Sequence, residues 1–586
     1  MHLTECTRQI SHNLPQHTIS RTRRACQAPL ALPQLTICEF HHSSPVMNPS
    51  QNAQQETQER VRRASEPFDR EDADFIIRSS DKVEFYVHRI ILALASPVFA
   101  AMLMLPQPLG ADVHRPAVDV VEDSETLDAF LRVCYPLPDP ELTVLDLIRK
   151  VLAAAAKYEA AAVSASMRMA LLRPAILEPN PLRVFAIACC FGLEAEARTA
   201  AERAVINNRV SGRICAELGE ITAGAYHRLL RLNSTRKTTK SKRSGINSVT
   251  VDFTGIGPFC EPPKHTARAA RASLQTVAAP FDAKDADLVL RSRDSIDFRV
   301  YRSILALASP TILQKAPLLS VAESGDDEAA TNRAPPIHLM PEDSVVLDAL
   351  LRMCYPVDHP QLSDLDVLLD VLSAARSYGM KKAEQAIRAS WPAHIDKAPL
   401  RLYLAAACCG WAEEAQACAT ALVQQYDIPS IHSQYLPEME MMANEPYRRL
   451  LAFLEKRSKA ATSPCTLSPG DVCPEPSYFC GTTRDSRFPH SFSTAAPPSW
   501  SSSCFASFTT ALQNRPLGST LALATEHVKS FMRRAAGLQY VDSDMALVEC
   551  GAADDVSWAC AVVECYAREV EIAVEKVQLE VDGLAA

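Results

Sequence analysis

The chain has 586 residues, of which 47% are hydrophobic and 22% are charged, and its formal net charge is −9. These values are typical of a globular protein, and the acidic balance argues against a protein that coats nucleic acid, which is usually basic. The sequence contains no run of about 20 apolar residues that would predict a transmembrane helix.

The first 68 residues are polar and show no apolar period, so we expect a disordered N-terminal segment over residues 1–68. The opening residues also lack the apolar core of a secretory signal peptide. We therefore interpret the nineteen cysteines as reduced thiols of a protein in the cytoplasm, the nucleus or both.

The stretch DADFIIRSSDKVEFYVHRIILALASP, from Asp72 to Pro97, predicts two strands followed by a helix. An apolar run marks the first strand, and from Val83 apolar and polar residues alternate, as in a half-buried strand. From Arg89 the apolar period becomes helical. The inward face of this helix is predicted to hold Ile91, Leu94 and Ala95.

Ser96 and Pro97 are predicted to end this helix and to start the next one. Proline disfavours helical angles in the residue before it and suits the first helical position. A short strand is predicted at residues 117–121, and Asp123 is then expected to cap a third helix. The inward face of that helix is predicted to hold Leu127, Phe130, Leu131 and Cys134.

Thr143 is predicted to cap a long helix that runs through Tyr158, and an alanine-rich helix follows it. The inward face of the long helix is predicted to hold Leu147, Val151 and Ala155. Further helices are expected at residues 181–192 and 194–205 and around residues 226–230.

The chain contains this unit twice. Residues 285–310 match residues 72–97 at 16 of 26 positions without a gap, and LDALLRMCYP at 347–356 matches LDAFLRVCYP at 127–136 at eight of ten. Chance does not produce such agreement, so the unit is duplicated. The trailing helices recur as well, at residues 399–410, 412–423 and 447–451.

The order of elements resembles the opening of the BTB/POZ domain, in a form like the BTB proteins of fungi. In that family an acidic residue precedes a hairpin, and a strand ending near His-Arg leads into a pair of helices. The first copy matches at Asp74, Phe85, Val87, His88, Arg89, Leu92, Ser96, Pro97 and Phe99. The second copy matches at Asp287, Phe298, Val300, Arg302, Leu305, Ser309 and Pro310, with Tyr301 in place of the histidine and Leu313 in place of the phenylalanine.

The resemblance implies an α+β fold with two tandem BTB/POZ-like domains, each a short mixed sheet flanked by helices. The basic run STRKTTKSKRSG and the Gly and Pro after it predict a flexible linker, and a Ser/Pro-rich composition predicts a mostly disordered tail with helices at 520–536 and 556–580. The expected parts are a disordered segment (1–68), domain 1 (69–173), helical extension 1 (174–232), a basic linker (233–281), domain 2 (282–390), helical extension 2 (391–458) and the tail (459–586).

Motifs that would carry catalysis are missing from the sequence. It contains no HExxH, GxSxG or CxxC, and Gly255-Ile256-Gly257 lacks the rest of a phosphate-binding loop. The cysteines lie mostly among apolar residues and lack the charged neighbours that activate a thiol. We therefore expect no enzyme activity, no cofactor and no metal site.

Four charged residues recur at equivalent places in the two copies: Asp74, Arg89, Asp287 and Arg302. The resemblance allows a charged pocket that recruits a partner. The alternative is a structural ion pair or cap that holds the strand to the first helix, since a buried charge must be paired.

The resemblance implies a protein–protein interaction protein that works by homotypic or heterotypic association, without nucleic acid or membrane. Apolar residues of the first helices are candidates for partner binding: Ile91, Leu94, Ile304 and Leu307. We expect the two copies to pair within one chain, through these helices; a homodimer of chains is the alternative.

A substrate adaptor of a cullin-based ubiquitin ligase is an alternative function, because Val321 and Glu323 fit the hydrophobic-x-Glu pattern of cullin-binding domains. A transcription regulator is less favoured, because the sequence has no zinc finger or basic helix.

Overall fold

A computed structural model describes most of the chain from residue 62 to residue 580, all of it within the second of the two units into which the chain divides. The described residues are 62–104, 115–138, 140–210, 215–240, 247–261, 273–274, 276–309, 311–318, 335–466, 499–521 and 552–580. No helix in these ranges is long and apolar enough to cross a membrane.

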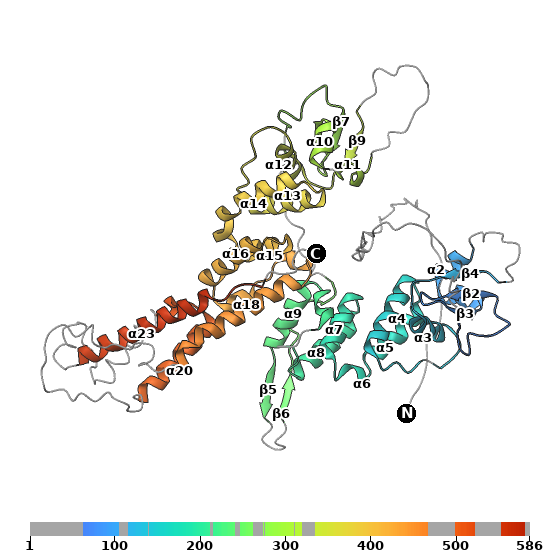
Figure 1. The fold of residues 1–586 in the computed structure, drawn as a ribbon, viewed down its shortest axis with the longest axis horizontal. Helices are drawn as coiled ribbons and strands as arrows, with labels where there is room; N and C mark the ends of the chain where they lie inside the picture. The colour runs from blue at the N-terminus through green and yellow to red at the C-terminus, as the bar shows by residue number, and fades with distance from the viewer. Residues whose placement is uncertain are drawn as a thin grey trace, which may run out of the picture. The chain divides into compact units, whose positions relative to one another are not determined.

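The first repeat is a small mixed sheet with helices, an α+β arrangement (Figure 1). Its strands are β1 (Arg62–Arg63), β2 (Phe75–Arg78), β3 (Val83–Val87) and β4 (Ala117–Asp119), in the order β1-β3-β2-β4. Strands β2 and β3 are antiparallel, whereas β1 pairs with β3 and β4 with β2 in parallel. Its helices are α1 (Arg89–Ala95), α2 (Pro97–Leu103), α3 (Ser124–Cys134), α4 (Leu145–Lys157), α5 (Ala161–Leu171) and α6 (Pro174–Leu177).

Residues 281–397 repeat this order of elements. The strands are β7 (Leu288–Arg291), β8 (Asp297–Val300) and β9 (Ile337–Leu339), and the helices are α10 (Arg302–Ala308), α11 (Ile312–Lys315), α12 (Ser344–Cys354), α13 (Leu365–Ser377), α14 (Lys381–Ser390) and η2 (Trp391–Lys397). Phe75 pairs with Val87, and their sequence equivalents Leu288 and Val300 pair with each other. The second sheet therefore has the strand register of the first.

Each repeat is followed by a helical extension. Extension 1 contains α7 (Pro181–Cys190), α8 (Glu194–Ile206), η1 (Ala216–Gly219) and α9 (Ala223–Ser234). Extension 2 contains α15 (Pro399–Cys408), α16 (Ala412–Gln425), α17 (Ile428–Ser433), η3 (Pro437–Glu440) and α18 (Glu445–Thr462). Each extension shares one apolar core with its repeat, so a repeat and its extension form a single packed body.

The helix starts follow from short polar side chains. Asp123 and Asp343 cap α3 and α12, and each carboxylate accepts a hydrogen bond from the backbone N–H three residues later. The prediction that Thr143 caps α4 is wrong. The cap position is Val144, which makes no side-chain bond, whereas its equivalent Asp364 caps α13.

The predicted inward face of α1 is also wrong. The buried residue is Leu92, and Leu94 is 81% exposed; in α10, Leu305 is buried and Leu307 is 90% exposed. Residues two apart lie on opposite sides of a helix, so a seven-residue helix that buries Leu92 must expose Leu94. Ser96, one turn after Leu92, is fully buried on the same side and fixes this rotation.

Further corrections concern the segments predicted to be disordered or flexible. Phe68 is fully buried, so the first repeat begins before residue 69. Within 233–281, strands β5 (Lys237–Lys240) and β6 (Asn247–Thr250) form a hairpin, and the buried Phe259 packs edge-on against Phe185 of α7. Residues 247–261 are therefore anchored to extension 1, because Phe253 and Phe259 pack in that core, whereas Leu274, Val277 and Phe281 pack in the core of the second repeat.

The tail after residue 459 contains helices that pack on α18. They are η4 (Pro464–Thr466), α20 (Ser499–Asn514) and α23 (Ala552–Glu575). Leu512 of α20 lies in a small core with Tyr566, Val570 and Val574 of α23. Residues 499–514, the end of the Ser-rich stretch that was expected to be disordered, form a helix, because they have a partner to bury against. The helix predicted at 556–580 is present, and most of the one predicted at 520–536 lies outside the described residues.

We predict a sharp contrast between neighbouring leucines in the same helix. Leu92→Ala should lower the free energy of unfolding by about 2–5 kcal/mol, because it leaves a cavity in the core. Leu94→Ala should change it by less than about 0.5 kcal/mol, because the side chain is already in water. Denaturant unfolding of the full chain measures both, and Leu305→Ala and Leu307→Ala form the matched pair in the second repeat. Equal losses at Leu92 and Leu94 would contradict the helix rotation described above.

Candidate functional site

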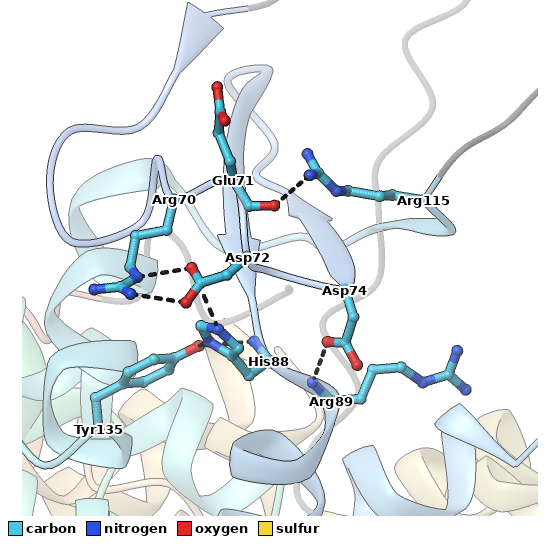
Figure 2. A network of polar contacts seen from close by, with 8 residues as sticks. All are labelled: Arg70, Glu71, Asp72, Asp74, His88, Arg89, Arg115 and Tyr135. Atoms are coloured by element: carbon cyan, nitrogen blue, oxygen red, sulfur yellow. Dashed lines mark hydrogen bonds and ion pairs between the residues drawn. The ribbon is translucent and has the colours of Figure 1, made fainter.

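The candidate site of the first repeat lies at the corner where β3 leads into α1. Asp74 stands just before β2, and its carboxylate accepts a hydrogen bond of 2.8 Å from the backbone N–H of Arg89 (Figure 2). The guanidinium of Arg89 donates instead to the carbonyl of Leu103, at 2.7 Å. Of the two structural alternatives, an ion pair or a cap, the contact between Asp74 and Arg89 is therefore a backbone cap at the start of α1.

The second repeat has the same cap. The carboxylate of Asp287 accepts a hydrogen bond of 2.8 Å from the backbone N–H of Arg302, the first residue of α10. A carboxylate near the positive end of a helix stabilises it and satisfies an N–H group that has no partner inside the helix. This structural role alone accounts for the recurrence of the acidic residue. Whether these charged residues also bind a partner stays a prediction.

A second cluster fixes the residue before α1. The hydroxyl of Tyr135 accepts a hydrogen bond of 2.8 Å from the backbone N–H of His88 and lies 3.1 Å from Nδ1 of its ring. Figure 2 shows the other edge of the ring facing Asp72, whose carboxylate lies 3.7 Å from Nε2. Arg70 donates two hydrogen bonds to that carboxylate and holds the pKa of Asp72 at about 2. The four side chains form one polar chain beside α1, which runs from the exposed Arg70 to the partly buried Tyr135.

The second repeat keeps the backbone contact and changes the ring. The hydroxyl of Tyr355 accepts a hydrogen bond of 2.8 Å from the backbone N–H of Tyr301, which replaces the histidine. A hydrogen bond to Asp285 raises the pKa of the Tyr301 hydroxyl. Both corners therefore have an aromatic ring next to an acidic residue, but only the first repeat has a ring that can carry a positive charge.

The outer side of the first helix is apolar and exposed in both repeats. Leu94 is 81% exposed and Leu307 is 90% exposed, whereas Ile91 and Ile304 are only partly buried. Ile90, one turn before Leu94, is 66% exposed and was not among the predicted residues. Ile90 could have been predicted from its i, i+4 spacing to Leu94, which places the two residues on the same side of the helix. Its equivalent in the second repeat is Ser303, so the two outer faces differ in apolar area.

These outer faces are not the contact between the two repeats within the chain. Among the described residues, the repeats meet through their extensions, where α9 packs against η3 and α18. The prediction that the copies pair through their first helices is therefore wrong, because the surface by which they meet lies on the extensions. The other two candidate partner residues, Val321 and Glu323, lie outside the described residues.

Several cysteines have raised pKa values because they are buried. Burial raises the pKa of the Cys134 thiol to about 12 and those of Cys190, Cys354 and Cys409 to about 11. Such thiols are protonated at neutral pH and are poor nucleophiles. In the described ranges, no group of three or more His, Cys, Asp or Glu side chains could hold a metal ion.

A comparison with protein families finds a match in the first repeat. A model of the BTB/POZ domain matches residues 65–174, from just before Phe68 to the start of α6. Domains of this family are protein–protein interaction modules. The match covers the first repeat and does not extend to the second. No curated protein matches the chain.

We predict that the two charges at the corner act independently. Asp74→Ala should cost about 0.5–2 kcal/mol of stability, because a cap acceptor is lost. Arg89→Ala keeps the backbone N–H, so the cap should survive it. The double variant should then lose the sum of the two single effects within about 0.5 kcal/mol in denaturant unfolding. A clear coupling energy between the two positions would indicate an ion pair instead, and Asp287→Ala with Arg302→Ala repeats the test in the second repeat.

Proposed function

We propose that the chain is a non-enzymatic protein of the cytoplasm or nucleus that associates with other proteins through two BTB/POZ-like modules. The family match supports this for the first repeat. For the second repeat, support comes from its identical strand register, its helix cap at Asp287 and its tyrosine contact at Tyr355. These are the contacts that shape the corner of the first repeat, so both repeats present a first helix in the same way.

The observation that carries the proposal is the exposure of an apolar side chain at one place in both repeats. Leu94 and Leu307 are equivalent in sequence and almost fully exposed, although each lies in a helix with a buried leucine two residues earlier. A single exposed leucine is ordinary on a protein surface. Its recurrence in both copies, next to a capped and therefore rigid helix start, favours an association surface. The occupant that fits is the first helix of another module of the same kind.

We predict that a charge on this face abolishes self-association and leaves the fold intact. Leu94→Asp should weaken chain–chain association at least about tenfold, because apolar contacts near the centre of an interface dominate its energy. Leu307→Asp reports on the second repeat, and the double variant should be fully monomeric. Light scattering over a range of concentrations measures the mass.

The matched control is Met169→Asp, which places the same charge on an exposed apolar residue of α5 (66% exposed), away from α1. It should associate like the wild type. If Leu94→Asp, Leu307→Asp and the control all behave like the wild type, the first helices are not the association surface.

A second candidate function, a substrate adaptor of a cullin-based ubiquitin ligase, is favoured by the order of elements. A helical hairpin follows each repeat, α7–α8 after the first and α15–α16 after the second. The second repeat also carries the hydrophobic-x-Glu pattern at Val321 and Glu323. A transcription regulator has no such support.

For the adaptor, we expect Val321→Ala combined with Glu323→Lys to abolish co-purification of a cullin without changing the unfolding curve. Glu328→Lys, in the same acidic run of the sequence, makes the same charge change outside the pattern and gives the control. A cullin retained by the first variant, or absent from the wild type, would remove this function from consideration.

A further inference from the structure

The contact between the two extensions has the symmetry of a dimer interface. Tyr226–Leu230 and Tyr447–Leu451 match in sequence with a spacing of 221 residues, and the same spacing relates Thr222 to Ala443. These last two residues pair with each other in an antiparallel bridge. A contact between equivalent residues is what a two-fold axis produces, and here the axis lies inside one chain.

The hydrogen bonds of this bridge obey the same symmetry. The backbone N–H of Ala223 donates to the carbonyl of Met442, at 3.2 Å, and the N–H of Asn444 donates to the carbonyl of Ile221, at 3.0 Å. Ala223 is equivalent to Asn444, and Ile221 is equivalent to Met442. Each bond is therefore the image of the other, and the bridge by itself would suit a pair of identical extensions.

One buried ion pair breaks the symmetry. The guanidinium of Arg228 is bonded to the carboxylate of Glu440, with Nη2 and Oε2 at 3.1 Å, and their side chains are only 6% and 7% exposed. The hydroxyl of Tyr435 donates to the same carboxylate, at 2.8 Å. The equivalent of Glu440 in extension 1 is Gly219, which has no carboxylate to offer. The equivalent of Arg228 is Arg449, which bonds Glu445 in its own helix.

A glycine makes room for this ion pair. Gly224 of α9 lies directly against the carboxylate of Glu440, and a Cβ atom at this position would overlap it. The equivalent residue in extension 2 is Glu445. The site of extension 1 that receives Glu440 is thus shaped by the lack of a side chain, whereas extension 2 has a long acidic side chain there.

These differences disfavour both pairs of identical extensions. Two copies of extension 1 would each place the buried Arg228 opposite Gly219, and a buried charge without a partner is strongly destabilising. Two copies of extension 2 would place Glu440 against Glu445, which fills the space that Gly224 leaves open, and the two carboxylates would compete for Arg449. Only the mixed pair gives Arg228 a carboxylate and Glu440 room beside a glycine, and rejection of wrong partners by such conflicts is a common source of specificity.

We propose that the extensions form a heterotypic joint in which extension 1 accepts only extension 2, and that the joint closes within a single chain. The segment between α9 and the second repeat tethers the two halves, which gives an effective concentration on the order of millimolar. The specificity lies in Arg228, Glu440 and Gly224. This inference does not depend on the proposed function of the first helices.

Disulfide trapping in the full chain tests the proposal. Thr222 and Ala443 form a non-hydrogen-bonded antiparallel pair, whose Cα atoms are about 4.5 Å apart, within the range that a disulfide spans. The chain with Thr222→Cys and Ala443→Cys should form an intrachain disulfide under mild oxidation, identified by peptide mapping at monomer mass. Chains that carry only one of the two cysteines should form no chain–chain disulfide at these positions, alone or mixed with each other.

The other outcomes overturn the proposal in different ways. A disulfide between two chains that both carry only Ala443→Cys, or only Thr222→Cys, would show that identical extensions pair. A disulfide in the mixture of the two single variants would show that the joint exchanges between chains. No disulfide in the double variant would show that the contact is absent in solution. Wild-type protein oxidised in parallel controls for the native cysteines.

A pair of glycine variants tests the basis of specificity. Gly224→Ala, in the double-cysteine chain, should displace Glu440 from Arg228 and reduce the yield of the intrachain disulfide. Gly219→Ala is the matched control, because a Cβ at Gly219 would meet no atom within 4 Å, and its yield should not change. Alanine favours helix over glycine, so a loss at Gly224, in α9, cannot come from a weaker helix. Equal yields for both variants would overturn the role of Gly224.

Discussion

A buried serine hydroxyl holds the corner on which each repeat depends. Ser96 is fully buried at the junction of α1 and α2. Its oxygen accepts a hydrogen bond from the N–H of Phe99, and its hydroxyl donates to the carbonyl of Tyr158 at the end of α4. Phe99 in turn stacks on the ring of Tyr158, with centroids 4.5 Å apart. One side chain thereby joins two helix ends and a core ring, and it sets which side of α1 faces solvent. Ser309 makes the equivalent bonds to Ile312 and Tyr378.

The buried polar contacts recur between the repeats, whereas the surface beside them differs. The tyrosine that binds the backbone before the first helix is present in both repeats, as Tyr135 and Tyr355. The ring that it supports is His88 in one repeat and Tyr301 in the other, and the exposed Ile90 is replaced by Ser303. A buried group that loses its partner is costly, which keeps the internal contacts fixed. Exposed positions carry no such cost, so the two modules can differ in partner while sharing a fold.

The strands β2, β3 and β4, their counterparts in the second repeat and most helices were predictable from sequence because their signals are local, whereas the hairpin β5–β6 was not predicted. Alternating apolar and polar residues predicted β3, and Asp123 marked the start of α3. The side of α1 that is buried was not predictable. This seven-residue helix has apolar residues on two sides, so either side could face the core. The hydrogen bond from Ser96 to the distant carbonyl of Tyr158 decides between them. The packing of Phe259 and of α20 depends on helices far away in the sequence. Likewise, the recurrence of Asp74 and Asp287 predicted a shared role, but only the structure decides between an ion pair and a backbone cap.

The ion pair between Arg228 and Glu440 also orders events during synthesis. The two residues are 212 positions apart in the chain. At a translation rate of about 5–20 residues per second, the carboxylate is made roughly 10–40 s after the guanidinium. Extension 1 can reach its packed form in that time, but its arginine remains in water until extension 2 emerges from the ribosome. The guanidinium of Arg228 is therefore buried only after extension 2 has been made, so a nascent chain that stops before residue 440 exposes the unfinished side of α9.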